Sequence, residues 1–296
     1  MALKLRILYR GPLSSCNYDC GYCPFAKHQE SVDELRQDRT ALLRFVEWAS
    51  AQNDIDLGIL FTPWGEALTR RIYQQAITRL SRLPRISKVA IQTNLSSSLT
   101  WLDAADCSTI ALWCTYHPSQ ASRAAFLKQC SELGRRGVRF SVGMVGLHKD
   151  FAEIDAMRAA LPKDIYLWIN AYKDQPNYYT EEQIAHLTRV DPHFGMNNQR
   201  HRSLGEMCTA GESAISVDGN GGIRRCHFVS QPIGNIYEAN WRDCLQRRTC
   251  PNQTCGCYIG YAFLPKLRHE ELFGAGLLER IPRHQLGPEY SNTTCQ

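Results

Sequence analysis

The chain has 296 residues, of which 44% are hydrophobic, and its formal net charge is +5. This length and this apolar fraction exclude a small stapled scaffold and favour one large domain with a small appended one. The charge is mild and spread along the chain without a dense Lys/Arg block, so we expect no nucleic-acid partner.

The first sixteen residues contain no seven-residue apolar core and no small-residue cleavage site. They predict an opening strand over Leu5–Tyr9 instead of a signal peptide. No stretch approaches 18 consecutive apolar residues, so we expect no membrane span. The sequence therefore predicts a cytoplasmic protein.

Short apolar runs then alternate with amphipathic segments. After the opening strand we expect strands at 57–62, 88–92, 109–115, 138–145 and 165–170, and helices at 33–51, 70–83, 119–136 and 152–160. This alternation predicts an α/β fold with a parallel sheet and helices outside it. Residues 1–190 are expected to form a partial (β/α)6 TIM-like barrel, in which functional side chains lie at the C-terminal ends of the strands.

The pattern changes after residue 190, where the chain becomes rich in Gly, Asn and Cys. A Gly/Asn-rich turn inside Ile215–Ile223 predicts a β-hairpin, and Glu238–Gln246 is expected to be a short helix. Residues 191–296 are therefore predicted to form a small C-terminal β-hairpin/helix cluster-binding module with an irregular tail.

Thirteen cysteines are many for a chain without a visible export signal, and their number is odd. A disulfide framework is therefore not expected, and closely spaced thiols point to metal binding. Cys107, Cys114 and Cys130 stand singly in apolar or helical surroundings and are expected to fill the core. The other cysteines fall into an N-terminal and a C-terminal group.

The N-terminal group consists of Cys16, Cys20 and Cys23, directly after the first strand. Three thiolates at this spacing can hold an iron–sulfur cubane and leave its fourth iron open for a small ligand. The alternative is a zinc site, for which His28 is near enough to be the fourth ligand. The position at the end of a barrel strand favours the cluster.

With Tyr22 before the last cysteine, this motif resembles that of the radical S-adenosylmethionine (SAM) superfamily. The resemblance extends over about Leu3–Asn170, where Trp64-Gly65-Glu66 is similar to the family's Gly-Gly-Glu turn except for its first residue. It implies a [4Fe–4S] cluster on Cys16, Cys20 and Cys23 that binds SAM. The residues that it implies as cofactor contacts are Tyr22, Gly65, Glu66, Thr93, Asn94, Thr115, His117, Ser141 and Asn170.

The C-terminal cysteines resemble those of the twitch module, a shortened form of the SPASM extension that carries an auxiliary [4Fe–4S] cluster. The resemblance implies Cys208, Cys226, Cys255 and Cys257 as ligands and leaves Cys250 as a thiol that could return a hydrogen atom to a substrate radical. In the rival assignment Cys250 is a ligand and Cys255 or Cys257 is spare. A structural zinc ribbon is the second alternative, and Cys244 and Cys295 are regarded as bystanders.

The whole chain is similar to a little-characterised bacterial radical SAM family and to the radical SAM epimerase that converts neomycin C to neomycin B. These resemblances imply a SAM-cleaving enzyme that epimerises a carbon of a polar small molecule such as an aminosugar, with flavodoxin or ferredoxin as reductant. A cationic aminosugar would need acidic pocket residues, and Glu206, Glu212 and Asp218 lie near the module in sequence. The alternatives are a radical SAM dehydrogenase or peptide-modifying enzyme and a zinc-stabilised binding protein.

Overall fold

The computed structural model describes residues 3–25 and 28–286, so Cys295 lies outside the described residues. The strands are β1 (Leu3–Arg10), β2 (Ile55–Phe61), β3 (Ile86–Thr93), β4 (Ile110–Thr115), β5 (Arg139–Val145), β6 (Leu167–Asn170), β7 (His201–Arg202), β8 (Met207–Cys208), β9 (Ala214–Asp218), β10 (Gly222–Arg224), β11 (Pro232–Asn235), β12 (Arg248–Thr249) and β13 (Thr254–Cys255). The α-helices are α1 (Val32–Ser50), α2 (Arg71–Ser81), α3 (Arg123–Arg135), α4 (Phe151–Ala160), α5 (Glu181–Val190), α6 (Phe194–Asn197), α7 (Tyr258–Tyr261) and α8 (His269–Phe273). Short 3₁₀ turns occupy η1 (Ala67–Thr69), η2 (Thr100–Ala104), η3 (His148–Asp150), η4 (Trp241–Cys244), η5 (Pro265–Leu267), η6 (Gly274–Gly276) and η7 (Arg283–Gln285).

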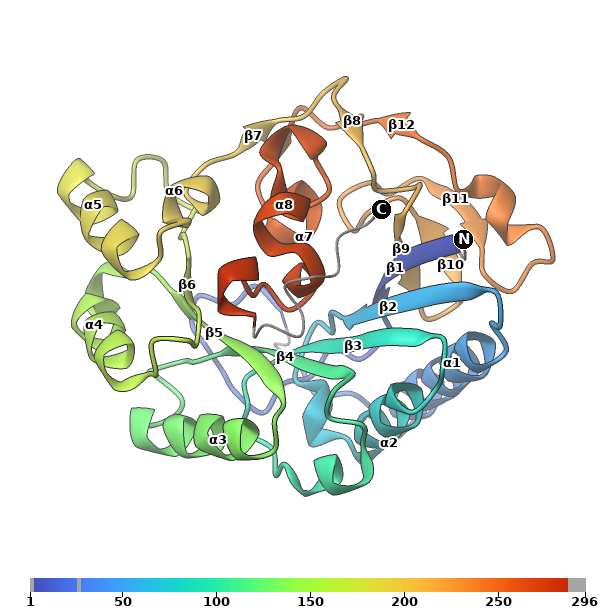
Figure 1. Cartoon of the computed structure of the whole chain (residues 1–296), viewed down its shortest axis with the longest axis horizontal. Helices are drawn as coiled ribbons and strands as arrows, with labels where there is room; N and C mark the ends of the chain where they lie inside the picture. The colour runs from blue at the N-terminus through green and yellow to red at the C-terminus, as the bar shows by residue number, and fades with distance from the viewer. Residues whose placement is uncertain (1–2, 26–27, 287–296) are drawn as a thin grey trace.

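Within the described residues, nine strands form one curved sheet in the order β11-β10-β9-β1-β2-β3-β4-β5-β6 (Figure 1). Strands β1 to β6 pair in parallel with their sequence neighbours, which confirms the predicted partial barrel. The predicted hairpin is confirmed as β9 and β10, but it does not stand apart, because β9 pairs in parallel with β1. The sheet therefore continues across the boundary expected at residue 190.

Three helical segments differ from the prediction. Helix α3 begins at Arg123 and not at Ser119, because the Ser122 side chain caps it by accepting from Ala125 N. Helix α5 was not predicted, although Thr180 and Gln183 form a capping box at its start. The helix expected over Glu238–Gln246 is wrong, since this segment forms only the 3₁₀ turn η4.

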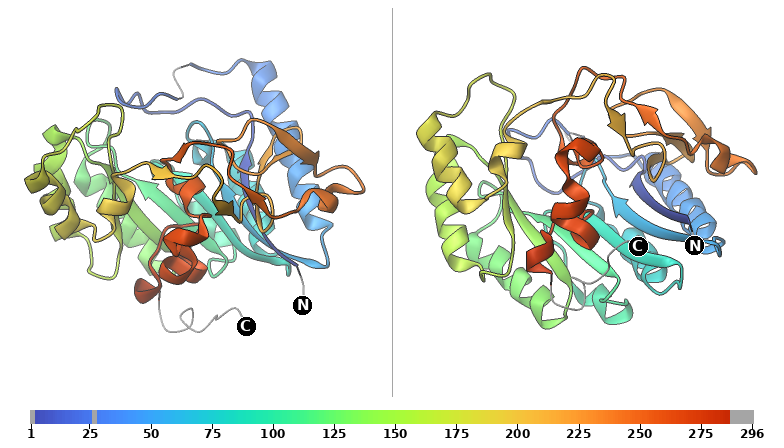
Figure 2. Two further views of the ribbon diagram at one scale, coloured as in Figure 1. Left: turned by 90° about the horizontal axis from the view of Figure 1, so that it is seen from above. Right: turned by 45° about the horizontal axis from the view of Figure 1, so that its top comes forward.

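The two faces of the sheet are covered by different parts of the chain. Alternate side chains such as Ile7 and Tyr9 of β1 pack outward against the helices, and Leu8 points inward. The inward face packs against α7, α8 and the segment up to Leu278, which lie along the concave side of the sheet (Figure 2). Residues 258–278, which the sequence left irregular, thus fill the barrel interior.

A buried ion pair joins this C-terminal segment to the sheet. Lys88 of β3 pairs with Glu279 and also donates to the carbonyl oxygen of Ala275, and both charged side chains are almost wholly buried. Burial lowers the pKa of Lys88 to about 8, and the Glu279 carboxylate opposes this shift. The pair therefore fixes the segment that carries residue 280 against the barrel wall.

Replacing Lys88 by methionine should lower the free energy of unfolding by about 3–5 kcal/mol, because Glu279 would be left buried and unpaired. Urea denaturation followed by circular dichroism measures this loss. The double variant Lys88→Met/Glu279→Leu is the matched control and should recover most of the stability. A single variant within about 0.5 kcal/mol of the parent would contradict the account.

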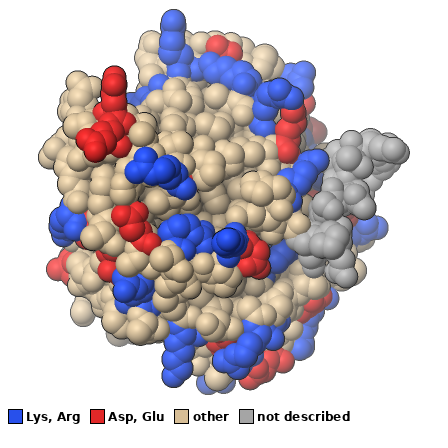
Figure 3. Space-filling view, turned by 60° about the vertical axis from the view of Figure 1, so that its left-hand side comes forward, with Lys and Arg blue, Asp and Glu red and all other residues tan. Residues whose placement is uncertain are grey.

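Charged groups are interspersed on the face formed by the helices that cover the later strands. Figure 3 shows lysine and arginine side chains lying among aspartates and glutamates there. No helix in the described part of the chain combines the length and apolar character needed to cross a membrane.

Candidate active site

A cleft of about 610 Å³ opens between the C-terminal ends of the barrel strands and the C-terminal module. Its volume is typical of small-molecule sites. The residues predicted from sequence that line it are Cys16, Cys20, Tyr22, Cys23, Gly65, Glu66, Thr93, Asn94, Thr115, His117, Asn170, Cys255 and Cys257. Both cysteine groups therefore reach the same cleft.

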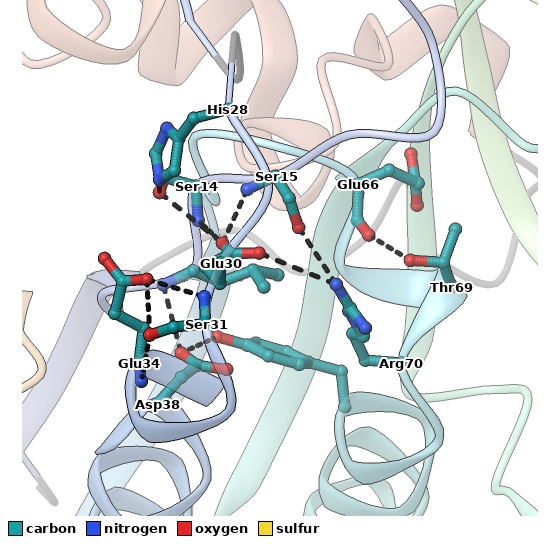
Figure 4. A network of polar contacts seen from close by, with 12 residues as sticks. Ser14, Ser15, His28, Glu30, Ser31, Glu34, Asp38, Glu66, Thr69 and Arg70 are labelled. Atoms are coloured by element: carbon teal, nitrogen blue, oxygen red, sulfur yellow. Dashed lines mark hydrogen bonds and ion pairs between the residues drawn. The ribbon is translucent and has the colours of Figure 1, made fainter. Parts of the chain in front are cut away.

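The loop before Cys16 is fixed by two carboxylates of the following segment (Figure 4). Glu30 accepts from the backbone N–H groups of Ser14 (2.5 Å) and Ser15 (2.6 Å), and its other carboxylate oxygen lies 3.5 Å from the Arg70 guanidinium. Asp38 accepts from Leu13 N (3.1 Å) in the same way. These bonds set where the chain leaves β1 and hence where the first cysteine stands.

His28, the alternative zinc ligand, is engaged elsewhere. Its Nε2 lies 2.9 Å from Ser14 Oγ, and Figure 4 shows the ring beside Ser14 and Glu30. This contact provides a role for His28 in the loop that does not involve a metal.

Replacing Glu30 by alanine should lower stability by about 1–3 kcal/mol at neutral pH, because two partly buried backbone donors lose their acceptor. Burial alone would raise the pKa of Glu30, but hydrogen bonds from Ser15 and Ser14 lower it below the usual 4.5. The stabilisation by this carboxylate is therefore present above pH 4.5 and is lost as the pH falls further. Thermal unfolding of both proteins across this range should show the two curves converging in acid, and a constant difference would contradict this role.

The surroundings of Cys16 suit a cluster ligand. The backbone N–H of Tyr18 donates to Cys16 Sγ at 3.4 Å, and Asn94 Nδ2 approaches the same sulfur at 3.8 Å. Burial raises the pKa of Cys16, while the hydrogen bond from Tyr18 opposes this shift and favours the thiolate. Hydrogen bonds to the sulfurs also tune such clusters. Cys23 N donates to Cys20 O at 3.0 Å, which closes the turn between the other two cysteines.

Gly65 is required by close backbone packing. A Cβ atom at this position would lie 1.7 Å from Ser15 O, and the neighbouring Glu66 N donates to that same oxygen at 3.1 Å. The preceding Trp64 packs on Phe25, and the Arg10 guanidinium lies over its ring at 4.0 Å. The second glycine of the turn is thus the one that this chain cannot replace.

Glu66 is buried and bound to the end of β3. Its carboxylate accepts from Thr93 Oγ1 (2.8 Å), Asn94 N (2.5 Å) and Leu68 N (3.1 Å). Burial raises the pKa of Glu66 to about 7, against the effect of these hydrogen bonds. The side chain therefore holds Thr93 and Asn94 at the cleft, and one lone pair of Oε2 is left for a cationic ligand.

Tyr22 and His117 meet across the cleft. The Tyr22 hydroxyl lies 2.5 Å from His117 Nδ1, and burial lowers the pKa of His117 to about 4. The imidazole is thus neutral near pH 7 and orients Tyr22 rather than binding an anion. Thr115 and Asn170 line the same cleft from the ends of β4 and β6.

Ser141 does not line the cleft, in contrast to the sequence-based assignment. It is fully buried in β5, where its hydroxyl donates to Glu279 O at 2.7 Å and accepts from Trp168 Nε1 at 3.1 Å. Its position in the middle of β5, below the strand's C-terminal end, explains the difference.

The structure groups the C-terminal thiols differently from the ligand set that the sequence suggested. Burial, with smaller contributions from the nearby thiols of Cys226, Cys250, Cys257 and Cys208, raises the pKa of Cys255 to about 12. The pKa of Cys226 is likewise raised to about 11 by burial, with contributions from Cys208 and Cys250. Cys208, Cys226, Cys250 and Cys255 therefore lie together, and Cys250 belongs to this group.

Strand pairing explains why Cys250 joins the group. Strand β12 pairs with β8 and places Arg248 opposite Cys208. Cys250 N then donates to Glu206 O at 2.8 Å, and Cys250 itself is buried. This position, behind the cleft, does not suit the hydrogen donor role that the sequence favoured for Cys250.

Cys257, in contrast to the buried Cys250, lies at the cleft. It lines the cleft, where it is exposed to solvent although protein surrounds it. Burial raises its pKa, while Lys173, Arg280 and Arg10 lower it. Its thiol thus faces the cleft and also lies near Cys255 of the group of four.

Several cleft residues were not predicted from sequence. Trp113 of β4 and Trp168 of β6 project inward at the cleft floor, where their rings meet at 5.3 Å. Lys173 and Arg280 join them, the first from the loop after β6 and the second from the C-terminal segment. The two tryptophans occupy inward positions of predicted strands, which could have identified them, but no motif marks the two cations.

No three His, Cys, Asp or Glu side chains in the described ranges converge tightly enough to hold a single metal ion. The chemistry of the donor sets nevertheless fits the expected clusters, since each consists of thiols alone and reaches the cleft, the first set through all three cysteines and the second through Cys255. Cys16, Cys20 and Cys23 would hold the first cluster, and Cys208, Cys226, Cys250 and Cys255 the second.

No protein-family model and no curated protein matches this chain. Among solved structures, native anSMEcpe with bound AdoMet and Cp18Cys peptide is similar at a TM-score of 0.54 and 15% identity, over 98% of this chain and 92% of that one. Native anSMEcpe with bound AdoMet is similar at a TM-score of 0.52 and 15% identity, over 81% of this chain and 83% of that one. The chain therefore has the fold of anSMEcpe, a protein whose solved structures contain bound AdoMet.

Proposed function

We propose that this chain is a radical SAM enzyme with an auxiliary [4Fe–4S] cluster, acting on a polar small molecule. The observation that carries the proposal is the meeting of the Cys16–Cys23 loop, the Gly65-Glu66 turn and the polar strand ends at one cleft. When bound, the reduced cluster and SAM supply a 5′-deoxyadenosyl radical that abstracts a hydrogen atom from the substrate. The fold shared with anSMEcpe supports this proposal.

The chain's own residues would position these groups. Cys16, Cys20 and Cys23 hold the first cluster, and Glu66 keeps Thr93 and Asn94 at the cleft wall. Glu66 lines the cleft, where its carboxylate would bind an ammonium group. The neutral His117 orients Tyr22 at the cleft.

The outcome that we favour is epimerisation, with Cys257 and not Cys250 as the hydrogen donor. A thiol that returns a hydrogen atom must reach the substrate, and Cys257 lines the cleft whereas Cys250 lies among the auxiliary ligands. The substrate radical would take the S–H hydrogen, forming a C–H bond and leaving a thiyl radical that one electron and one proton restore. Flavodoxin or ferredoxin would provide this electron and that for the first cluster.

The second candidate is a dehydrogenase or peptide-modifying enzyme in which the auxiliary cluster accepts an electron from the substrate radical. The group of four thiols, of which Cys255 lines the cleft, favours this outcome, since a redox centre there would lie near the substrate. Deuterium from heavy water in the product indicates the epimerase, and a product with two hydrogens fewer indicates the dehydrogenase.

The proposal is tested by anaerobic reconstitution with iron and sulfide. We expect about eight irons per chain and, on reduction, an electron paramagnetic resonance signal that changes when SAM is added. Bound zinc in place of iron would contradict the proposal. About four irons would remove the auxiliary cluster from it.

A further inference from the structure

We propose that the cleft recognises its substrate through an oxyanion, a carboxylate or a phosphate, bound by Arg280. This deepens and rests on the proposed function, because it takes the cleft to be the substrate site. It departs from the cationic aminosugar that the sequence suggested.

The first observation is the state of Arg280 itself. Its side chain lines the cleft, yet the residue is only 2% exposed. Within the described residues its guanidinium makes no hydrogen bond or ion pair, and its buried Nε has no partner. A guanidinium has five N–H donors in a planar fork that matches a carboxylate or a phosphate. A buried cation of this kind is costly unless a ligand pairs with it.

The second observation is the aromatic cage around the guanidinium. Its carbon lies 4.6 Å from the ring centre of Trp168, 4.7 Å from that of Tyr258 and 5.9 Å from that of Trp113. Rings stabilise the face of a guanidinium but do not satisfy the N–H groups along its edge. The cage therefore holds the charge in place and leaves the donors for a ligand.

The neighbouring carboxylates are already occupied. Glu279 pairs with Lys88, and Asp191 accepts from Tyr166 Oη, Ile169 N and His193 N at 2.6–2.9 Å. Burial would lower the pKa of Arg280, but Tyr261, Tyr166 and Asp191 raise it above its usual value. The guanidinium thus stays cationic without a direct partner.

The backbone places this side chain under strain. Arg280 has a φ of +56°, in the left-handed region that residues with a Cβ rarely adopt. Such a conformation costs about 1–3 kcal/mol and persists where the surrounding structure fixes it, often at ligand sites. The buried pair of Glu279 with Lys88 provides that constraint next to it.

Other positively charged side chains line the cleft beside Arg280. Lys173 and Arg200 line it with Arg280, and Lys173 Nζ donates to Asn197 O and Gly256 O at 2.6 and 2.5 Å. The acidic residues among those that line the cleft are Glu66, held by Thr93 and Asn94, and Asp174, which is exposed.

The acidic residues considered for an aminosugar lie outside this cleft. Glu206 pairs with Lys266, Glu212 with Arg247 and Asp218 with Arg224. Their charges are thus neutralised elsewhere, and the charge of the cleft favours an anionic group in the substrate.

Binding of four matched pyranoses to the reconstituted full chain tests the proposal. Glucuronate, glucose 6-phosphate, glucose and glucosamine are titrated by calorimetry, without SAM and with it. We expect one of the two anions to bind at least about tenfold more tightly than glucose and glucosamine. Which of the two binds more tightly shows whether the site recognises a carboxylate or a phosphate. Arg280→Met should weaken this anion about 10- to 100-fold and leave glucose unchanged.

Two further variants keep the test interpretable. Arg280→Lys retains the positive charge but not the planar fork of donors. It should therefore weaken anion binding less than Arg280→Met does. It also replaces the methionine variant in the test if that variant does not fold. Arg36→Met removes the same charge from an exposed arginine on α1 and should bind the anion as the parent does.

Equal binding of the anions to Arg280→Met and the parent would overturn the proposal, as would tighter binding of glucosamine or no binding of either anion. A loss of SAM affinity with unchanged anion binding would assign Arg280 to the cofactor instead and also overturn it. Iron content and 5′-deoxyadenosine release are measured on the same samples. SAM cleavage without anion binding rejects the substrate class alone, and a failure of cleavage rejects the proposed function.

Discussion

Replacing Cys16, Cys20 and Cys23 together by alanine should abolish SAM cleavage and remove about four irons per chain. These thiols are the sole candidates on the first loop for holding a cluster at the cleft, next to Glu66 and Asn94. The loss should be complete, because without the first cluster no electron reaches the sulfonium group. Chromatography of 5′-deoxyadenosine and a colorimetric iron assay measure the two effects.

The matched control for this triple variant is Cys107→Ala. Cys107 packs at the edge of the core between the sheet and the outer helices and belongs to neither cysteine group. The iron content and the rate of SAM cleavage should therefore stay at parental levels. The auxiliary cluster should also persist in the triple variant, and the remaining iron should have its spectrum. Unchanged iron in the triple variant, or cleavage above background, would refute the assignment of the first site.

The second large effect that we expect is a difference between the alanine variants of Cys250 and Cys257. Cys250→Ala should lower bound iron by about four per chain, because it removes one of four clustered thiolates. Cys257→Ala should keep all the iron and the release of 5′-deoxyadenosine, because its thiol faces the cleft. With a substrate in hand, Cys257→Ala should stop the transfer of solvent deuterium into the product.

Cys244→Ala controls for the loss of any thiol from the module, since Cys244 lies against Gly234 and outside the group of four. It should behave as the parent in both assays. The opposite pattern, with iron lost from Cys257→Ala and retained in Cys250→Ala, would restore the ligand set that the sequence suggested.

The parallel strands and the first cysteine loop were predictable from sequence because both are local signals. Apolar runs such as Ile55–Phe61 identify buried strands, and the spacing of Cys16, Cys20 and Cys23 places three thiols on one loop at the end of the first strand. The Gly65-Glu66 turn was predictable for the same reason, although only the structure shows that the Ser15 carbonyl excludes a side chain there.

The rest depends on contacts between distant parts of the chain. Pairing of β12 with β8 carries Cys250 to Cys208, and no spacing within the sequence encodes that pairing. Arg280 and Glu279 enter the barrel through a segment without helical or strand periodicity, and Glu279 meets a lysine 191 residues away. The gathering of Lys173, Arg200 and Arg280 at the cleft therefore could not be predicted from the sequence.

The most direct test of the central claim is to incubate the reconstituted protein with SAM and dithionite under strict exclusion of oxygen. Release of 5′-deoxyadenosine and methionine in equal amounts, dependent on the reductant and on intact Cys16, Cys20 and Cys23, is the result that we predict. An iron-loaded protein that leaves SAM uncleaved under these conditions would contradict the account.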